Sequence, residues 1–275
     1  MNLFRLRTKI IFLLPFRIKI LCARLLRRTL FSEIEIIYKL LKSFAKSKIM
    51  IDVGAHIGGS LAPFANCGWN IYAFEPDVKN REELIKNFGQ CSNVKIEPLA
   101  ISNISKKGVP FFRSDVSTGI STLSPFHKSH KETEQKIDVT TLTEYCKIYE
   151  IDAIDFLKID VEGFDLFVLQ GFPWEKLRPL VILAEFENKK TELLGYTFND
   201  ICNFLVEKGY SVLVSEWDPI VEYGRIHHWR RFIKYPCELL DENAVGNLIA
   251  VSDPILFNSL LTLSSKYSRI LKTKN

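Results

Sequence analysis

Lys48-Ile-Met-Ile-Asp-Val-Gly-Ala-His-Ile-Gly-Gly-Ser60 is the stretch that decides the fold. Its first six residues form a short apolar run, and Gly54 follows at once, which indicates a buried strand that ends in a turn. Residues 58–67 are then predicted to form a helix. Glycine in such a turn lets the backbone approach a ligand closely, and the N-terminus of a helix offers free N–H groups.

The same strand-and-helix pattern is repeated downstream. Asn70–Glu75 is predicted to form a second strand, which Pro76 ends, and Asp77 is a suitable N-cap for a helix that runs to about Phe88. Residues 93–99 are predicted to form a third strand. Strands that alternate with helices at this spacing predict a parallel sheet with right-handed crossovers, and therefore an α/β fold.

The remaining elements are less regular. Further strands are expected at Val109–Arg113, Ile137–Thr141, Phe156–Val161, Leu180–Phe186, Tyr210–Trp217 and Ala244–Val251, further helices at Thr143–Tyr149 and Phe198–Lys208, and a polar loop at Ser114–Gln135. We divide the chain into a basic, helical N-terminal arm (1–47), one α/β domain (48–251) and an amphipathic C-terminal tail (252–275).

Composition and charge narrow the function classes. The chain has 275 residues, of which 47% are hydrophobic and 25% are charged, so it is an ordinary globular protein. The net charge is +5, but residues 1–31 contain eight basic residues and no acidic one, which leaves −3 for the rest. This balance argues against a nucleic-acid-binding surface over the whole domain. Six scattered cysteines predict buried thiols in a reducing compartment.

The N-terminal arm has two interpretations. Its apolar run, Ile10–Phe16, contains Pro15 and is followed by Arg17 and Lys19, so it is too short for a membrane span or a signal peptide. We favour a helix that docks on the domain. The alternative is a basic amphipathic helix on an anionic membrane. A cytoplasmic protein is expected, with peripheral contact at the inner membrane surface under the alternative.

A nucleoside cofactor is indicated by the glycine turn and an acidic residue at the next strand end. Glu75 follows Gly54 by 21 residues, and a carboxylate there accepts hydrogen bonds from both ribose hydroxyls. His56 stands where a dinucleotide fingerprint has its second glycine and would crowd a pyrophosphate. S-adenosylmethionine has no pyrophosphate and fits better. The alternative is a tight turn beside a solvated Glu75.

A second chemical motif is Lys158-Ile-Asp-Val-Glu-Gly163. Charges at alternate positions of an apolar strand face one side of the sheet, near its carboxyl end, where α/β proteins bind ligands. Burying Lys158 and Asp160 is costly unless they pair or contact a ligand. A purely structural Lys158–Asp160 ion pair is the alternative.

Three segments, Ile51–Gly58, Phe74-Glu-Pro76 and Asp155–Gly163, resemble the FkbM family of S-adenosylmethionine-dependent methyltransferases. The resemblance spans about residues 48–251. It implies a class I (Rossmann-like) methyltransferase fold, a three-layer sandwich whose seven-stranded, mostly parallel sheet has the order 3-2-1-4-5-7-6 and an antiparallel last strand. It also implies methyl transfer to oxygen, often on sugars of polysaccharides, glycolipids or glycosylated natural products.

These observations give candidate site residues. For the cofactor they are Asp52, Gly54, His56, Gly58, Glu75, Pro76, Leu99, Ala100 and Asp160. A sugar hydroxyl needs a general base, and Asp160 is the first candidate, with His127, His130 and Glu185 in reserve and Lys158 beside it. Asp160, Glu162 and Glu185 resemble a metal-binding set, but Lys158 on the same face would repel a cation, so we expect metal-independent chemistry.

The acceptor is expected to be a small molecule or a glycan, and no nucleic-acid partner is expected; the oligomeric state is left open. The aromatic and basic segment Tyr223–Phe232 is either an acceptor site or an ordinary surface loop. There are three competing functions. The first is a ribose 2′-O-methyltransferase that acts on RNA, because Lys158, Asp160 and Glu185 resemble part of its Lys/Asp/Lys/Glu set. The others are a nicotinamide-dependent oxidoreductase and a non-catalytic membrane-surface protein.

Overall fold

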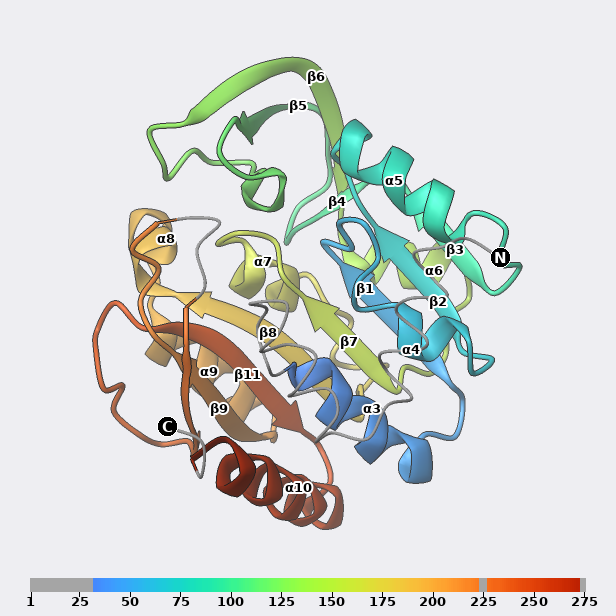
Figure 1. The fold of residues 1–275 in the computed structure, drawn as a ribbon. Coiled ribbons are helices and arrows are strands. Elements are labelled where there is room, and N and C mark those ends of the chain that lie inside the picture. Colours follow the sequence, from blue (N-terminus) through green and yellow to red (C-terminus); the bar gives the residue numbers. More distant parts are fainter. Residues whose placement is uncertain (1–31, 223–226, 273–275) are drawn as a thin grey trace.

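The computed structural model describes residues 32–222 and 227–272, and a mixed sheet of eight strands runs through them. The strands are β1 (Ile49–Val53), β2 (Asn70–Phe74), β3 (Val94–Glu97), β7 (Phe156–Ile159), β8 (Val181–Glu187), β9 (Ser211–Trp217), β10 (Trp229–Lys234) and β11 (Val245–Val251). Their order across the sheet is β10-β9-β11-β8-β7-β1-β2-β3 (Figure 1).

The order β3-β2-β1-β7-β8-β11-β9 is the expected class I order, 3-2-1-4-5-7-6. β1, β2, β3, β7 and β8 pair in parallel, and β11 is antiparallel to both of its neighbours, β8 and β9, as expected for the last strand. The prediction of seven strands was wrong by one, because β10 adds an antiparallel strand at the edge. The sequence analysis did not predict β10, because two adjacent arginines interrupt the alternation of apolar and polar residues that is typical of a strand.

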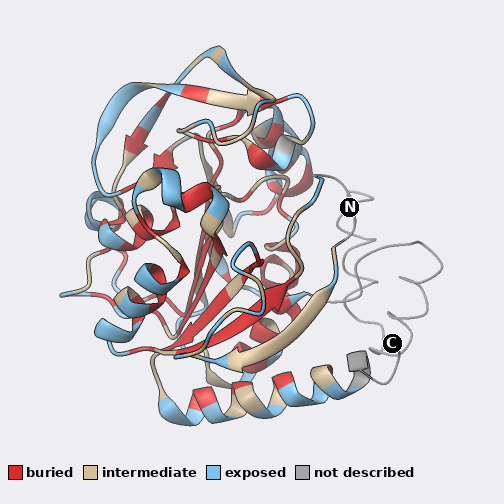
Figure 2. Ribbon diagram, turned by 90° about the vertical axis from the view of Figure 1, so that its left-hand side faces the viewer, coloured by how far each residue is buried: buried red, intermediate tan, exposed pale blue. Residues whose placement is uncertain are grey.

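Helices cover both faces of the sheet, which makes a three-layer sandwich. One face packs against α3 (Glu33–Phe44), α4 (Ala62–Ala65), α5 (Val78–Phe88) and α10 (Pro254–Lys272), and the other against α6 (Leu142–Ile148), α7 (Asp165–Gln170) and α9 (Phe198–Glu207). Alternate residues of a strand point to opposite faces of the sheet. Met50 packs in the apolar cluster on the α3 side and Ile51 in the cluster on the α6 side. Buried residues are accordingly concentrated on the central strands (Figure 2).

A second, three-stranded sheet lies above the carboxyl ends of the central strands (Figure 1). It contains β4 (Ala100–Ile101), β5 (Lys106–Ser114) and β6 (His130–Thr140), in the order β4-β6-β5. The sequence predicted β5 and β6 but made them too short, because their exposed halves are polar. The expected polar loop Ser114–Gln135 is therefore shorter, and it contains a 3-10 turn, η1 (Thr118–Ile120).

Local sequence explains how the first crossovers begin. The Asp77 side chain caps α5 as expected, accepting hydrogen bonds from the N–H groups of Lys79 (2.8 Å) and Asn80 (3.3 Å). The helix expected over 58–67 is wrong in extent, because only Ala62–Ala65 is α-helical. Gly58 has φ of +89°, which interrupts a helix, and Pro63 in the first turn of α4 starts it again.

The described segments outside residues 48–251, which contain α3 and α10, pack on the sheet. α3 lies within the helical arm (1–47) that the sequence indicated, and its buried Glu33 accepts hydrogen bonds from the Ser215 hydroxyl (2.6 Å) and the Trp217 indole N–H (2.8 Å). α10 contacts α3 through Tyr267, whose hydroxyl lies 2.6 Å from the Lys39 ammonium. The expected amphipathic tail is thus a helix docked on the domain. Residues 1–31, with both interpretations of their role, lie outside the described residues.

The five cysteines among the described residues match the expectation only in part, and Cys22 lies outside those residues. Cys91, Cys146 and Cys202 are buried free thiols, Cys237 is half-buried, and Cys67 is exposed beside the Tyr38 hydroxyl. The prediction of buried thiols is therefore wrong for Cys67, which follows the short helix α4 at the surface. Among the described residues, no helix is both long enough and apolar enough to cross a bilayer.

Replacing Glu33 tests whether α3 belongs to the folded domain. Glu33→Ala leaves the Ser215 hydroxyl and the Trp217 N–H without their buried acceptor. We expect a loss of about 2–4 kcal/mol in the free energy of unfolding, measured by urea denaturation. Lys42→Ala changes an exposed residue of the same helix and should cost well under about 1 kcal/mol. Equal effects of the two changes would contradict this role of Glu33.

Candidate functional site

A pocket with a volume of about 240 Å³ lies at the carboxyl ends of β1, β2, β7 and β8. The strand order reverses between β1 and β7, and α/β proteins bind ligands at such a switch point. The lining residues come from these strand ends, from the start of the second sheet and from the loop after β5. They are Val53, Gly54, His56, Phe74, Glu75, Pro76, Asn80, Leu99, Ala100, Ile101, Phe111, Gly119, Ser121, Thr122, Leu123, Asp160, Val161, Glu162, Phe164 and Glu185.

Gly54 forms the floor of the pocket, where β1 and β7 end side by side. Its φ is +81°, and a Cβ atom built on it would lie 1.9 Å from the carbonyl oxygen of Asp160. The position therefore admits only glycine, for both conformational and steric reasons. The turn after β1 thus brings bare backbone to the pocket, as its sequence predicted.

Lys158 holds the same two strand ends together from beneath the pocket. Its ammonium donates to the carbonyl oxygen of Gly54 (2.7 Å) and forms ion pairs with Asp52 (3.1 Å) and Asp160 (3.4 Å). Burial favours a lower pKa for Lys158, but the two carboxylates outweigh it and raise the pKa above its ordinary value. The Lys158–Asp160 ion pair that the sequence left open is therefore present, and it includes Asp52.

The expected alternation along the Lys158-to-Gly163 motif ends early. β7 stops at Ile159, and Glu162 has φ of +57°, so residues 160–163 form a turn rather than a continued strand. Lys158 consequently lies below the pocket, whereas Asp160 and Glu162 line it. The expectation that buried Lys158 and Asp160 pair or contact a ligand is confirmed by their ion pair, but only Asp160 and Glu162 face the pocket.

Glu75 lines the pocket at the end of β2 and is only 5% exposed. Its two carboxylate oxygens accept hydrogen bonds from the backbone N–H groups of His56 and Asp77, both at 2.8 Å. Burial raises the pKa of Glu75 to about 7, although these two hydrogen bonds oppose the shift. The alternative of a solvated Glu75 is therefore wrong. Each oxygen retains a lone pair for a ligand hydroxyl.

The other candidate cofactor residues divide into two groups. His56, Pro76, Leu99 and Ala100 line the pocket with Gly54, Glu75 and Asp160. Asp52 and Gly58 are not among the described residues that line it: Asp52 is fully buried against Lys158 and the Ser60 hydroxyl, and a Cβ on Gly58 would meet the Phe88 ring. The sequence placed them in the right turn but could not show which atoms face inward.

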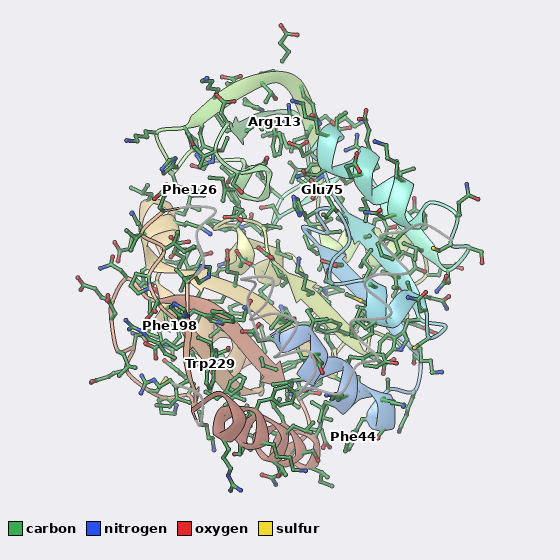
Figure 3. All side chains as sticks on the ribbon, viewed as in Figure 1. Phe44, Glu75, Arg113, Phe126, Phe198 and Trp229 are labelled. Carbon is green, nitrogen blue, oxygen red and sulfur yellow. The ribbon has the colours of Figure 1, made fainter. Side chains whose placement is uncertain are left out.

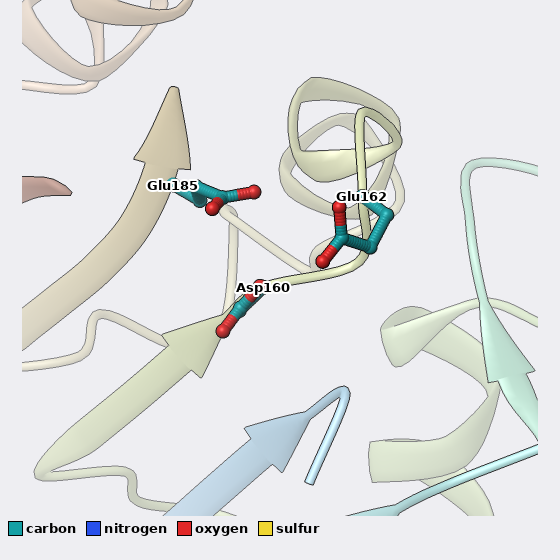
Figure 4. A group of neighbouring side chains, drawn as sticks. All are labelled: Asp160, Glu162 and Glu185. Carbon is teal, nitrogen blue, oxygen red and sulfur yellow. The ribbon is translucent and has the colours of Figure 1, made fainter. Parts of the chain in front are cut away.

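Three carboxylates meet at the β8 side of the pocket. Asp160, Glu162 and Glu185 each have a carboxylate oxygen within 4.8 Å of the other two, and Glu162 and Glu185 face each other beside Asp160 at the end of β7 (Figure 4). The buried ammonium of Lys190, in α8 (Asn188–Thr191), pairs with Glu162 (2.6 Å), Glu185 (3.1 Å) and Glu187 (2.8 Å). We define these four carboxylates and Lys190 as the acidic cluster.

The lysine that contacts Glu162 and Glu185 in the acidic cluster is not the one that the sequence analysis expected. Lys158 was expected to repel a cation here, but it pairs with Asp52 and Asp160, and Lys190 is the lysine that contacts Glu162 and Glu185. Burial raises the pKa of Glu162 to about 7 and that of Glu185 well above its ordinary value, while Lys190 opposes both shifts. Lys190 escaped the sequence analysis; its only signal was a lysine pair directly after a strand rich in Glu.

Asp165 is a second residue that the sequence analysis missed. It lies in the first turn of α7, is 1% exposed and accepts a 3.3 Å hydrogen bond from the Gly163 N–H through Oδ2, whereas Oδ1 has no hydrogen-bond partner among the described residues. Burial, reinforced by Asp160, raises the pKa of Asp165 to about 7. Asp165 therefore adds a further carboxyl group behind the acidic cluster.

The loop between β5 and β6 closes one side of the pocket. Gly119, Ser121, Thr122 and Leu123 line it, and Asp77 anchors the loop by bonds from Ser121 and Arg113. Figure 3 shows Glu75 near the end of β2 and Phe126, in this loop, across from it.

The two loop histidines, His127 and His130, do not line the pocket as the described residues define it. His130 bonds the carbonyl oxygen of Ile120 (2.7 Å), and His127 bonds the Ser129 hydroxyl (2.7 Å). Both side chains therefore stabilise the loop by hydrogen bonds.

The aromatic and basic segment after β9 is mostly structural. Arg230 pairs with Asp218, and Arg231 pairs with the buried Glu216 (2.6 Å). The Trp229 indole N–H donates to Ser215 (3.2 Å), and the segment continues as β10. Residues 223–226 lie outside the described residues. The expectation of a surface loop is therefore wrong for Trp229–Phe232, which belong to strand β10, and none of the described residues of the segment lines the pocket.

Comparison with known proteins defines the class. Residues 52–212 match the methyltransferase FkbM domain, which is more than half of the chain. The chain therefore belongs to the FkbM family of methyltransferases. It is 28% identical over 146 residues to the hexuronic acid methyltransferase AglP of Haloferax volcanii; the match covers 52% of this chain and 58% of that protein. The chain thus spans somewhat more than half the length of this relative.

Solved structures with a similar fold include two methyltransferases. A precorrin-6y C5,15-methyltransferase from Geobacter metallireducens is 13% identical, with 80% of this chain and 87% of that one covered and a TM-score of 0.43. A methyltransferase FkbM from Methylobacillus flagellatus is 18% identical, with coverage of 74% and 43% and a TM-score of 0.44.

Substitution of Gly54 tests the contact between the ends of β1 and β7. Gly54→Ala adds a methyl group 1.9 Å from a backbone oxygen, whereas Gly68→Ala, also at positive φ (+72°), meets nothing within 4 Å. Both changes carry the left-handed penalty of about 1–2 kcal/mol. We expect Gly54→Ala to lose clearly more stability in urea denaturation than this control. Equal losses would show that the two strand ends move apart freely.

The raised pKa of Asp165 predicts a pH-dependent stability. The folded protein binds a proton at Asp165 that the unfolded chain releases at about pH 4, so this contribution is lost as pH rises through about 7. Asp165→Asn should therefore lose less stability between pH 5 and pH 8 than the wild type does, by at least about 1 kcal/mol. Urea titrations at each pH measure this, with the exposed Asp152→Asn as control. A parallel pH dependence for Asp165→Asn and the wild type would contradict it.

Proposed function

We propose that this protein is an S-adenosylmethionine-dependent O-methyltransferase that acts on a sugar hydroxyl. The observation that carries the proposal is the combination of the bare backbone at Gly54 with the buried Glu75 carboxylate in one pocket at the strand switch point. The family supports methyl transfer. The printed name of the curated relative, a hexuronic acid methyltransferase, supports a sugar acceptor.

The residues of the pocket fit the proposed cofactor. Glu75 would accept the two ribose hydroxyls, since its oxygens retain acceptor capacity. Leu99 and Ala100, which line the pocket beyond β3, would contact the adenine, and the backbone after Gly54 would contact the amino-acid part. When bound, the cofactor supplies a methyl group on a positively charged sulfur, which leaves as a neutral thioether when the acceptor oxygen takes the methyl.

Asp160 is our proposed general base. It lines the pocket, its side chain is 42% exposed and its carboxylate is 3.4 Å from the Lys158 ammonium. The ion pair fixes the position of the carboxylate and leaves it accessible to a hydroxyl proton. Asp160 would accept this proton as the acceptor oxygen attacks the methyl carbon. The proposed mechanism uses no metal ion. Glu185, in the acidic cluster, is the second carboxylate within reach of the same end of the pocket.

Cofactor binding tests the role of Glu75. Glu75→Gln retains the size of the side chain but replaces one acceptor oxygen with an NH₂ group, so we expect affinity for S-adenosylmethionine to fall about 10–100-fold in calorimetry. Glu207→Gln, an exposed change on α9, should leave the affinity unchanged. Wild-type affinity in Glu75→Gln would remove Glu75 from the ribose site.

Turnover tests the assignment of the base. Asp160→Asn preserves shape and removes the proton acceptor, so methyl transfer should fall about 10²–10⁴-fold while cofactor affinity changes little. The measurement is formation of S-adenosylhomocysteine with a glycan extract as acceptor, with Glu185→Gln in parallel. A larger loss in Glu185→Gln, with Asp160→Asn close to wild type, would move the base to Glu185.

A further inference from the structure

We propose that the β8 side of the pocket takes a sugar without negative charge near the methylated hydroxyl, a neutral or amino sugar rather than a uronic acid. This inference rests on the proposed function and specifies its acceptor. It also separates this chain from the relative whose name states a hexuronic acid.

The two ends of the pocket have different chemistry. Glu75 follows β2 and Glu185 belongs to β8, and β1 and β7 lie between these strands. Three strand spacings of about 4.8 Å place β2 and β8 roughly 14 Å apart across the sheet, so the two residues line the pocket from opposite sides. If Glu75 contacts the ribose, the acceptor enters at the opposite end, where Asp160, Glu162 and Glu185 converge (Figure 4).

The acceptor end has more carboxyl groups than lysine side chains among the described residues. Lys190 forms ion pairs with Glu162, Glu185 and Glu187. Lys158 forms ion pairs with Asp52 and Asp160 and donates a hydrogen bond to the Gly54 carbonyl. Asp165 is buried behind the cluster with one oxygen lacking a hydrogen-bond partner. Burial and the neighbouring carboxyl groups raise the pKa values of Glu162 and Glu185, so negative charge is already disfavoured here, and a further carboxylate would meet the same conditions without a free counter-ion. An uncharged or ammonium-bearing ring would not.

The same groups suit a polyhydroxylated ring. Carboxylates are strong acceptors for hydroxyl and ammonium donors, and Asp160, Glu162 and Glu185 offer several lone pairs within 4.8 Å of one another. Phe164 and Leu123 also line the pocket and provide apolar surface for the C–H face of a sugar. The acceptor end therefore combines hydrogen-bond acceptors with apolar surface and has no lysine or arginine of its own among the described lining residues.

Three sugars that differ in one group test the inference. Methyl β-glucoside, the corresponding 2-amino sugar and the corresponding glucuronide are offered to the full-length protein saturated with S-adenosylhomocysteine, and binding is measured by ligand-observed NMR titration. We expect the glucuronide to bind at least about tenfold more weakly than the glucoside, because an added carboxylate at a carboxyl-rich, largely buried site without a free counter-ion costs that much or more. The amino sugar should bind as well as the glucoside or better.

Variants locate the effect in the acidic cluster. Glu185→Gln removes one of the converging carboxylates and should narrow the gap between glucuronide and glucoside severalfold, whereas Glu207→Gln, which removes a distant charge, should leave the gap unchanged. Circular dichroism shows that each variant is folded. An unchanged gap in Glu185→Gln would show that the cluster does not set the preference.

The outcomes separate the inference from the proposed function. Glucuronide binding as tight as, or tighter than, glucoside binding overturns the inference and leaves the methyltransferase assignment intact. Binding of none of the three sugars by a protein that binds S-adenosylhomocysteine overturns the sugar assignment. Failure to bind S-adenosylmethionine or S-adenosylhomocysteine in calorimetry overturns the proposed function itself.

Discussion

The pocket depends on the contact between the ends of β1 and β7. A side chain on Gly54 would lie 1.9 Å from the carbonyl oxygen of Asp160, so the two strand ends meet through backbone alone. Lys158 stabilises this contact between the strands by a hydrogen bond to the Gly54 carbonyl and ion pairs with Asp52 and Asp160. Because one lysine joins both strands, the residue that follows β1 and the carboxylate that follows β7 keep fixed positions. This fixed position is what a reaction that depends on alignment requires.

The sequence predicted the alternation of strands and helices and the glycine turn because both depend on local patterns, whereas the strand order was implied by the resemblance to the FkbM family. Apolar runs, Pro76 and the Asp77 cap mark strand ends and helix starts without reference to distant residues. β10 was missed because Arg230 and Arg231 form ion pairs with Asp218 and Glu216, contacts that no local pattern reveals. The helix expected over 58–67 was too long because Gly58 adopts a φ of +89°, which the apolar pattern of the segment does not reveal.

The candidate site was predictable in part for the same reason. Gly54, Glu75 and Asp160 follow strands directly, and the topology alone brings them to one pocket. Asp52 and Lys158 belong to the same strands but lie beneath it, since the side on which a buried charge finds a partner is set by packing. Lys190 enters from a short helix after β8, and only the folded chain shows that it pairs with Glu162.

The most direct test of this arrangement is a crystal structure of the full-length protein with S-adenosylhomocysteine. Both ribose hydroxyls should lie within hydrogen-bond distance of the Glu75 carboxylate, and the sulfur should point toward the end of β7, beside Asp160. The adenine should contact Leu99 and Ala100. A nucleoside bound elsewhere, or a ribose turned away from Glu75 with its sulfur remote from Asp160, would contradict the assignment of this pocket as the methyl-transfer site.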